Sequence, residues 1–327
     1  MSEKFNQGYA VVIGIGADLP VTVDDATAIA HFLNNPACCA YPHNQVRLLT
    51  EDAANRESIL SSLDWLANTA EPNATAIVYF SGHGLETPDY YLMPFGYDIK
   101  NLESTAISGQ LFSEKLRSIQ TRQLLVLLDC CHAGGQAQIK GAVKSPLPPT
   151  TIDELKKHSG RVIIASSRKD EVSWTGNPYS VFTTSVLEAL AGYGAFEQDG
   201  FARVLDLALW AGRKVPERTN EKQHPIIKVS NLEDNFAIAW YAGGAKKVQP
   251  LEWISSHSLE TSSVNAAQLA TWQRMLVNYR ENLLLIEERM SEYVDFTAIP
   301  LQLIKSKRQL EAKITDLEQK LGLTSFP

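Results

Sequence analysis

One stretch of the chain constrains its fold more than any other. Residues 124–128 form an uninterrupted apolar run that leads into the segment DCCHAGG at 129–135. Such a run, bounded by a turn, is typical of a strand buried on both faces of a parallel sheet. Ligands of open α/β sheets bind beyond the carboxyl ends of the strands. The sequence therefore predicts that the two thiols after this strand lie at a sheet edge where chemistry can occur.

A second apolar run has the same form. Residues 76–80 lead into SGHG at 81–84, again a strand that ends in glycines around one titratable side chain, His83. Cys131 follows His83 by 48 positions, which leaves room for a helical crossover between two parallel strands. Because the carboxyl ends of neighbouring parallel strands meet at one edge, we predict that His83 and Cys131 lie together.

This pair of side chains is suited to nucleophilic catalysis. A histidine within hydrogen-bonding reach can take the proton of a cysteine thiol and produce the reactive thiolate. The imidazolium can later protonate a leaving amine. The unobstructed amide of Gly84 and the amide of Cys131 are candidate donors to the oxyanion of a tetrahedral intermediate. No sequence pattern identifies a carboxylate that would orient His83. A backbone carbonyl can orient the imidazole instead.

Other sites can be built from the same residue types. A metal could be bound by residues 130–132 and His83, but adjacent cysteines project in different directions. The sequence also lacks the Cys-x-x-Cys spacing of zinc sites and redox pairs. The segment GIG at 14–16 follows an apolar strand, yet the third glycine and the distant acidic residue of a dinucleotide site are missing. We therefore expect no metal and no cofactor.

The order of apolar and amphipathic segments predicts an α/β fold. Alternating strands and helices favour a parallel sheet with helices on both faces. From residue 251 onward, heptad-like stripes on either side of Pro300 predict two long helices folded as a hairpin. We expect strands at 9–16, 46–50, 76–80, 124–128, 161–167 and 223–229, and helices at 23–33, 55–68, 108–119, 181–191 and 204–215.

Composition limits the classes of function. The chain has 327 residues, of which 44% are hydrophobic, so it can bury a sizeable core. Its formal net charge of −7 comes from interspersed charges, which argues against a nucleic-acid groove or a membrane patch. No run approaches the roughly 20 apolar residues of a membrane helix, and the N-terminus has no signal-peptide core. The four cysteines form adjacent pairs, which predicts a reducing, cytoplasmic compartment.

The motifs YFSGHG at 79–84 and DCCHAG at 129–134 resemble those of the caspase-like cysteine peptidases. The similarity is to the metacaspase and prokaryotic orthocaspase branch and extends over residues 9–241. The spacing of about 50 residues between histidine and cysteine is also that of caspases. The resemblance implies a caspase–hemoglobinase fold, with His83 as general base and Cys131, directly before a histidine, as nucleophile. Cys130 stands where the family commonly has serine.

The resemblance also implies a primary specificity pocket lined by acid groups. The matching positions are Asp25, Ser81 and Asp129. Two carboxylates in a narrow pocket can hold a guanidinium through forked hydrogen bonds, so we expect cleavage after Arg or Lys. Two alternatives concern the first of these positions. Asp24 could exchange roles with Asp25, or Asp25 could simply begin its helix.

On this basis the chain divides into four regions. They are a large-subunit-like region at 1–135, a flexible connection at 136–160, a small-subunit-like region at 161–245 and the helical extension at 251–327. The connection is rich in glycine, proline and lysine, and we expect a protease of this specificity to cut itself there at Lys140 or Lys144.

The resemblance further implies a protein substrate and regulation. We expect the extension to connect the enzyme to an activator or to restrain it, in a bacterial stress or antiviral pathway. Calcium dependence stays open, because the sequence has no EF-hand loop. Two alternatives remain: an inactive caspase-fold scaffold that recruits partners through its C-terminal helices, and a different thiol hydrolase or transferase that uses the same dyad.

Overall fold

The computed structural model describes residues 4–87, 89–130, 160–168, 171 and 173–251, together with single residues and short stretches between 279 and 314. The chain divides into two compact units, Met1–Ile254 and Ser255–Pro327. The predicted connection at 136–160, with Lys140 and Lys144, lies outside the described residues except for Gly160.

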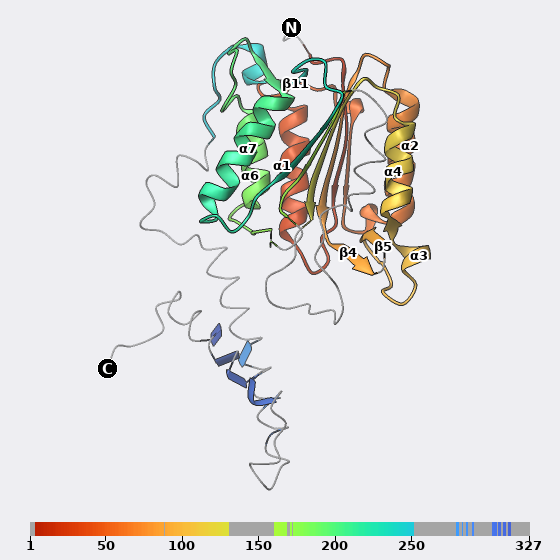
Figure 1. Cartoon of the computed structure of the whole chain (residues 1–327), viewed down its shortest axis with the longest axis vertical. Coiled ribbons are helices and arrows are strands. Elements are labelled where there is room, and N and C mark those ends of the chain that lie inside the picture. The colour runs from red at the N-terminus through yellow and green to blue at the C-terminus, as the bar shows by residue number, and fades with distance from the viewer. Residues whose placement is uncertain are drawn as a thin grey trace, which may run out of the picture. The chain divides into compact units, whose positions relative to one another are not determined.

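A six-stranded sheet forms the centre of the first unit (Figure 1). Its strand order is β10-β8-β7-β3-β1-β2. Every pairing in it is parallel except that of β10 with β8. The expected parallel-dominated sheet is therefore confirmed, with one antiparallel strand at an edge. The strands are β1 Gly8–Gly14, β2 Val46–Thr50, β3 Thr75–Gly82, β7 Gln123–Cys130, β8 Arg161–Ala165 and β10 Ile226–Ser230.

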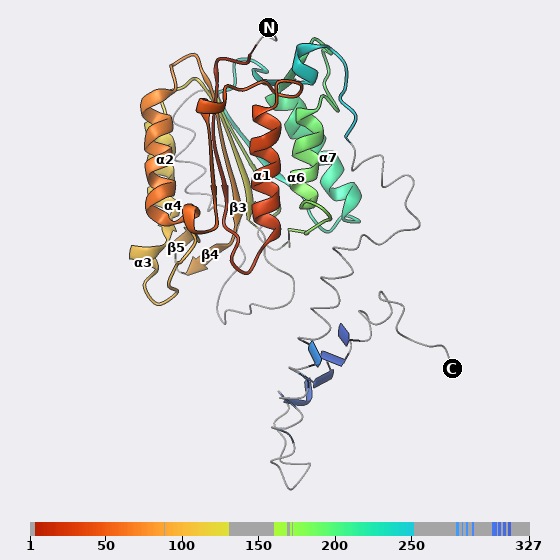
Figure 2. The same ribbon diagram turned by 180° about the vertical axis from the view of Figure 1, so that it is seen from behind.

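Helices cover both faces of this sheet, as Figures 1 and 2 show from opposite sides. Side chains of the buried strands alternate between two hydrophobic cores. Tyr79 and Leu127 belong to one core, whereas Phe80 and Leu128 belong to the other. The first core is closed by α1 Val21–Asn34, α6 Val181–Leu190 and α7 Val204–Arg218, and the second by α2 Arg56–Thr69 and α4 Gly109–Ser118.

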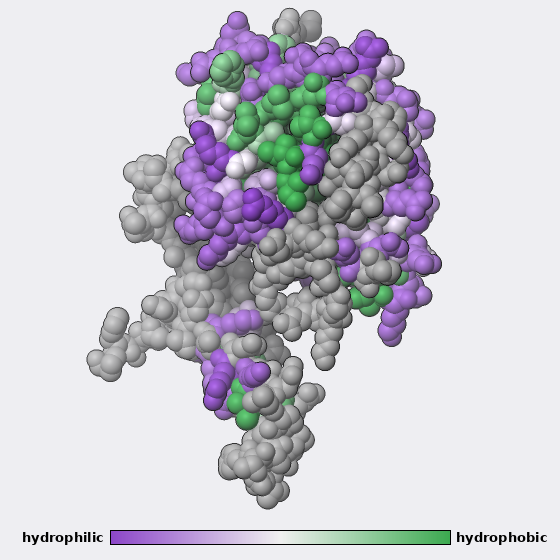
Figure 3. Space-filling model, viewed as in Figure 1, coloured by the Kyte–Doolittle hydropathy of each residue, from purple (hydrophilic) through white to green (hydrophobic). Residues whose placement is uncertain are grey.

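Short elements complete the unit. The segment after His83 forms a three-stranded sheet in the order β4-β5-β6, and a two-stranded sheet pairs β11 with β9. Among the coloured residues of the face in view, Figure 3 shows mostly hydrophilic side chains, and the largest group of hydrophobic ones lies near the middle of the upper part. The elements are β4 Gly84–Thr87, β5 Asp89–Leu92, β6 Ile107–Ser108, β9 Phe201–Arg203, β11 Ala237–Trp240, α3 Leu102–Thr105 and the 3-10 turns His43–Gln45, Glu51–Ala54 and Ala242–Gly244.

In the second unit, the described residues between 279 and 290 and between 303 and 314 are helical. The ammonium nitrogen of Lys313 lies 5.3 Å from the centroid of the Tyr279 ring. This contact joins the two helical stretches, as expected for a helical hairpin. The bend expected near Pro300 lies outside the described residues. Within the described part of the chain, no helix is long and apolar enough to cross a membrane.

Candidate functional site

The carboxyl ends of β3 and β7 lie next to each other. The register of the pair places Ser81 opposite Asp129 and Gly82 opposite Cys130. His83 is the next residue after β3, and Cys131 is the next residue after β7. The two strands are thus neighbours, as the sequence predicts. Cys131 lies outside the described residues, so its contact with His83 stays a prediction.

A carboxylate that the sequence analysis missed contacts His83. The Nε2 atom of His83 lies 2.9 Å from Oδ2 of Asp18, in the loop between β1 and α1. The side chain of His83 is 17% exposed and that of Asp18 is 54% exposed. We expected no particular carboxylate to orient the imidazole, and the structure differs on this point. No local pattern in the sequence marks Asp18, because the contact spans 65 positions.

Cys130 lies in an environment that keeps its thiol protonated. Its Sγ atom lies 3.3 Å from the hydroxyl of the buried Tyr90. Burial and the charge of Asp129 raise the pKa of Cys130 to about 12, although the Tyr90 hydroxyl acts in the opposite direction. A thiol with this pKa is a poor nucleophile at neutral pH. Cys130 is therefore poorly suited to be the reactive cysteine.

Gly84 begins β4 and approaches the same tyrosine. A Cβ atom at Gly84 would lie only 2.5 Å from the hydroxyl oxygen of Tyr90, so a larger residue would displace the buried ring. This contact gives Gly84 a structural role. Its expected role as an amide donor to an oxyanion stays a prediction.

Asp25 and Asp129 form a buried pair of acid groups at the same edge. Asp25 accepts a hydrogen bond from the backbone N–H of Ser180 at 2.9 Å and one from the hydroxyl of Ser81 at 3.3 Å. Burial, and secondly the charge of Asp129, raises the pKa of Asp25 from 3.8 to about 8. The neighbouring Asp24 is exposed. Asp25, and not Asp24, is therefore the residue of α1 that pairs with Asp129, so it does more than begin the helix.

Three hydroxyl groups donate hydrogen bonds to Asp129. The hydroxyl of Ser173 donates to Oδ1 at 2.9 Å, and those of Ser180 and Thr183 donate to Oδ2 at 2.5 and 3.2 Å. Ser180 also caps α6, because its hydroxyl accepts from the N–H of Thr183 at 2.9 Å. The end of β7 and the start of α6 are thus fixed by one cluster, in which Ser180 bonds to both carboxylates.

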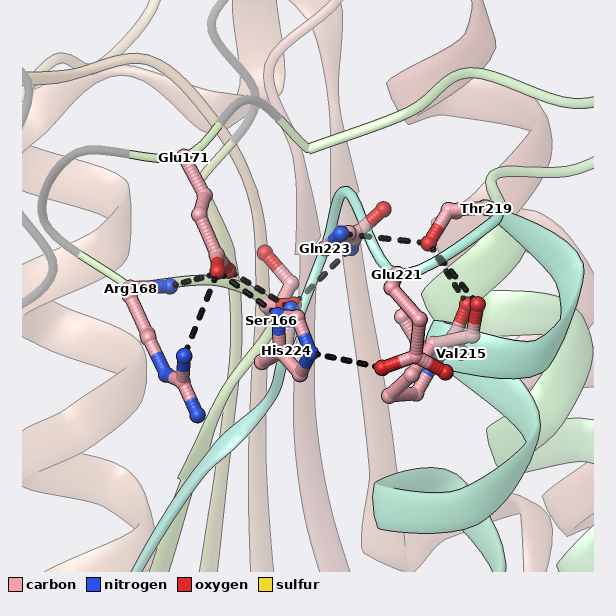
Figure 4. A network of polar contacts seen from close by, with 9 residues as sticks. Ser166, Arg168, Glu171, Val215, Thr219, Glu221, Gln223 and His224 are labelled. Atoms are coloured by element: carbon pink, nitrogen blue, oxygen red, sulfur yellow. Dashed lines mark hydrogen bonds and ion pairs between the residues drawn. The ribbon is translucent and has the colours of Figure 1, made fainter.

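A polar network extends this cluster to the loop before β10 (Figure 4). The side-chain amide of Gln223 donates to the carbonyl of Ser166 at 2.8 Å and to the hydroxyl of Ser173 at 3.1 Å. His224 places Nδ1 2.7 Å from Glu171 and Nε2 3.0 Å from Glu221. The hydrogen bonds with Glu171 and Glu221 raise the pKa of His224. The network thereby fixes the segment that carries Ser173.

Sequence reasoning did not identify Ser173, Ser180, Thr183 or Gln223. Each is an ordinary polar residue whose partner is distant in the chain, so only the fold reveals its role. Among the described residues, no group of three or more His, Cys, Asp or Glu side chains is arranged to hold a metal ion.

Comparison with known proteins gives a family. A family model described as the caspase domain matches residues 7–237. The chain is similar to Metacaspase-1A of Neurospora crassa, with 25% identity over 236 residues that cover 63% of this chain and 49% of that protein. It is also 23% identical to Metacaspase-1A of Aspergillus terreus over 251 residues, which cover 65% and 58% of the two chains.

The chain spans about half the length of the curated relatives it matches. A crystal structure of a protein from Geobacter sulfurreducens matches with a TM-score of 0.47 and 15% identity, covering 74% of this chain and 99% of that one. The caspase-domain model covers the greater part of the sequence, including the sheet, its helices and both strand ends. The chain therefore belongs to the caspase domain family.

Proposed function

We propose that the chain is a cysteine endopeptidase that cleaves peptide bonds after Arg or Lys. The observation that carries the proposal is the register of β3 and β7. Gly82 pairs with Cys130 at the ends of these neighbouring parallel strands, and His83 and Cys131 are the next residues in sequence. This register supports the proposal that a base and a thiol act together at one edge of the sheet. Membership of the caspase domain family supports the same conclusion.

In this mechanism His83 takes the proton of Cys131 and leaves a thiolate. The thiolate attacks the carbonyl carbon of the scissile bond, and the protonated imidazole then gives its proton to the leaving amine. Water hydrolyses the resulting thioester and restores the thiol. Cys130 takes no part, because at a pKa of about 12 it stays protonated.

The buried acid pair supports the specificity for basic residues. Asp25 and Asp129 provide two acid groups beside the strand end that precedes His83. A guanidinium or ammonium group at this position would stabilise both carboxylates and displace the proton that Asp25 holds at neutral pH. An acidic substrate side chain would meet repulsion instead. Ser81 donates to Asp25 and so belongs to the proposed pocket.

The test uses fluorogenic peptides that end in Arg, Lys, Asp or Leu, with the full-length chain in calcium and in a chelator. We expect turnover of the Arg and Lys peptides only. Cys131→Ala removes this turnover, whereas the matched variant Cys130→Ala retains it. Turnover of the Arg peptide by Cys131→Ala would overturn the assignment of the nucleophile. Equal turnover of the Asp peptide by the wild-type chain would overturn the specificity.

We further propose that the enzyme processes itself and is regulated through residues 251–327. Lys140 and Lys144 fit the specificity of the proposed pocket. Intact-mass measurement of the wild-type chain should reveal fragments that end at one of them, and Cys131→Ala should stay whole. In this proposal an activator contacts residues 251–327, and the enzyme acts in a bacterial stress or antiviral pathway. A full-length Cys131→Ala chain provides the bait for that partner.

A further inference from the structure

Asp18 is held in a tight turn next to the imidazole of His83. In this turn the N–H of Leu19 donates to the carbonyl of Gly16 at 2.9 Å. The hydroxyl of the buried Thr22 accepts from the N–H of Gly16 and donates to the carbonyl of Leu19, both at 2.8 Å. The turn that carries Asp18 is therefore fixed to the first turn of α1.

The backbone of the same turn is bound to β3. The N–H of Ile15 donates to the carbonyl of Ser81 at 3.0 Å, two residues before His83. Gly16 and Ala17 both have positive φ angles, of 71° and 56°. Such an angle is uncommon for alanine, so the surrounding hydrogen bonds hold the chain in this conformation. Asp18 and His83 are thus carried by segments that are joined only a few residues away.

We propose that Asp18 is a positioning residue for His83, and this inference rests on the proposed peptidase function. The carboxylate of Asp18 accepts the Nε2–H of His83 at the observed 2.9 Å. This hydrogen bond selects the tautomer in which Nδ1 carries no proton, so that Nδ1 receives the proton of Cys131. The proton moves from sulfur to Nδ1 and later from Nδ1 to the leaving amine.

The exposure of Asp18 limits the size of its effect. At 54% exposure its charge is partly screened by water, so it resembles a surface ion pair more than a buried one. Burial, helped by the charge of Asp18, also raises the pKa of the Tyr97 phenol. We therefore expect a tenfold effect on turnover rather than a thousandfold one.

Screening also makes the role separable from folding, because a surface pair adds little to stability. Asp18→Ala should lower kcat on Arg and Lys peptides about tenfold, with KM within about twofold of wild type and the melting temperature unchanged. Asp18→Asn should lose less, since its amide oxygen accepts the same hydrogen bond without the charge. Asp18→Glu should restore most of the activity. Asp52→Ala, an exposed aspartate beyond the end of β2, is the matched control and should behave as wild type.

A second readout needs no substrate. Alkylation of Cys131 by iodoacetamide at pH 6.5, followed by peptide mass spectrometry, reports how much thiolate the histidine produces. Asp18→Ala should slow this reaction about tenfold, and Asp52→Ala should not. Unchanged kcat and unchanged alkylation in Asp18→Ala would overturn the positioning role, as would a loss confined to KM or to melting temperature. If the wild-type chain neither cleaves basic peptides nor alkylates faster than an ordinary thiol, the proposed function and this inference both fail.

Discussion

The acid pair has a cost in stability that a single substitution should remove. In the folded chain, burial and the charge of Asp129 raise the pKa of Asp25 from 3.8 to about 8. Between these two pH values the folded chain holds a proton that the unfolded chain releases. Linkage requires that stability falls as pH rises through this window. At neutral pH the protein therefore folds against the preference of this carboxyl group to ionise.

The size of the cost follows from the pKa values. One unit of pKa difference corresponds to about 1.4 kcal/mol, and pH 7 lies roughly three units above the ordinary pKa of Asp25, which gives roughly 4 kcal/mol. Asparagine has the shape of the protonated acid and does not ionise. Its amide can also keep the hydrogen bond from the N–H of Ser180. We expect Asp25→Asn to be more stable than wild type at pH 7, by at most about 4 kcal/mol.

Thermal unfolding between pH 5 and pH 8.5 measures this effect. The melting temperature of the wild-type chain should fall with pH more steeply than that of Asp25→Asn, so the two curves should separate toward high pH. Asp24→Asn, an exposed neighbour on α1, should follow the wild type. Parallel curves for Asp25→Asn and wild type would refute the reasoning about the buried acid pair.

The same variant should lose function as it gains stability. Hydrogen bonds to charged groups contribute about 1.5 to 3 kcal/mol, so kcat/KM for the Arg peptide should fall roughly ten- to a hundredfold. Such opposition between stability and activity is common where a site contains unfavourable charge. Wild-type activity of Asp25→Asn on the Arg peptide would remove Asp25 from the proposed pocket.

Two further predictions concern ion pairs away from the strand ends. Glu188→Gln should lower the free energy of unfolding, measured in urea, by about 2 kcal/mol, because Glu188 is buried and binds Arg218 through both oxygens. Glu217→Gln, on the surface of α7, should leave the urea midpoint of unfolding nearly unchanged. Equal losses of stability in the two variants would contradict the argument. His224→Gln should lower the melting temperature most below pH 6.5, because Glu171 stabilises the charged imidazole ring. The difference in melting temperature from wild type should vanish as pH rises through the raised pKa of His224. A difference that grows with pH would contradict this prediction.

The sheet could be predicted from the sequence because its buried strands have no polar interruptions. The runs at 76–80 and 124–128 are apolar on both faces, and both strands are found in the middle of the sheet. The starts of two helices could also be predicted, because Asn and Ser are common N-cap residues. In the structure, Asn55 and Ser108 accept capping hydrogen bonds from backbone amides. The antiparallel direction of β10 could not be predicted, since an edge strand can pair parallel or antiparallel to its neighbour.

The site could be predicted only where a motif marks it. His83 lies between two glycines directly after an apolar run, and Cys131 stands in a motif of the same form; together the two motifs point to a site, although neither does so alone. Asp18 has no such signature, because its role depends on a turn in which Ala17 takes a positive φ angle. The state of Asp25 was equally hidden, since it depends on burial and on Ser180, 155 positions away. Interactions that close over such distances require the folded chain.

The hydrogen bonds of Ser180 have a consequence for a nicked molecule. Asp25 and Asp129 precede residues 131–159, whereas Ser180 follows them, and β7 pairs with β8 across the same interval. Scission of the backbone within that interval would cut none of these bonds and none of the strand pairings between residues that the structure describes. The two polypeptides should then stay associated through gel filtration at neutral pH. Separately expressed halves should, by the same reasoning, assemble into one particle.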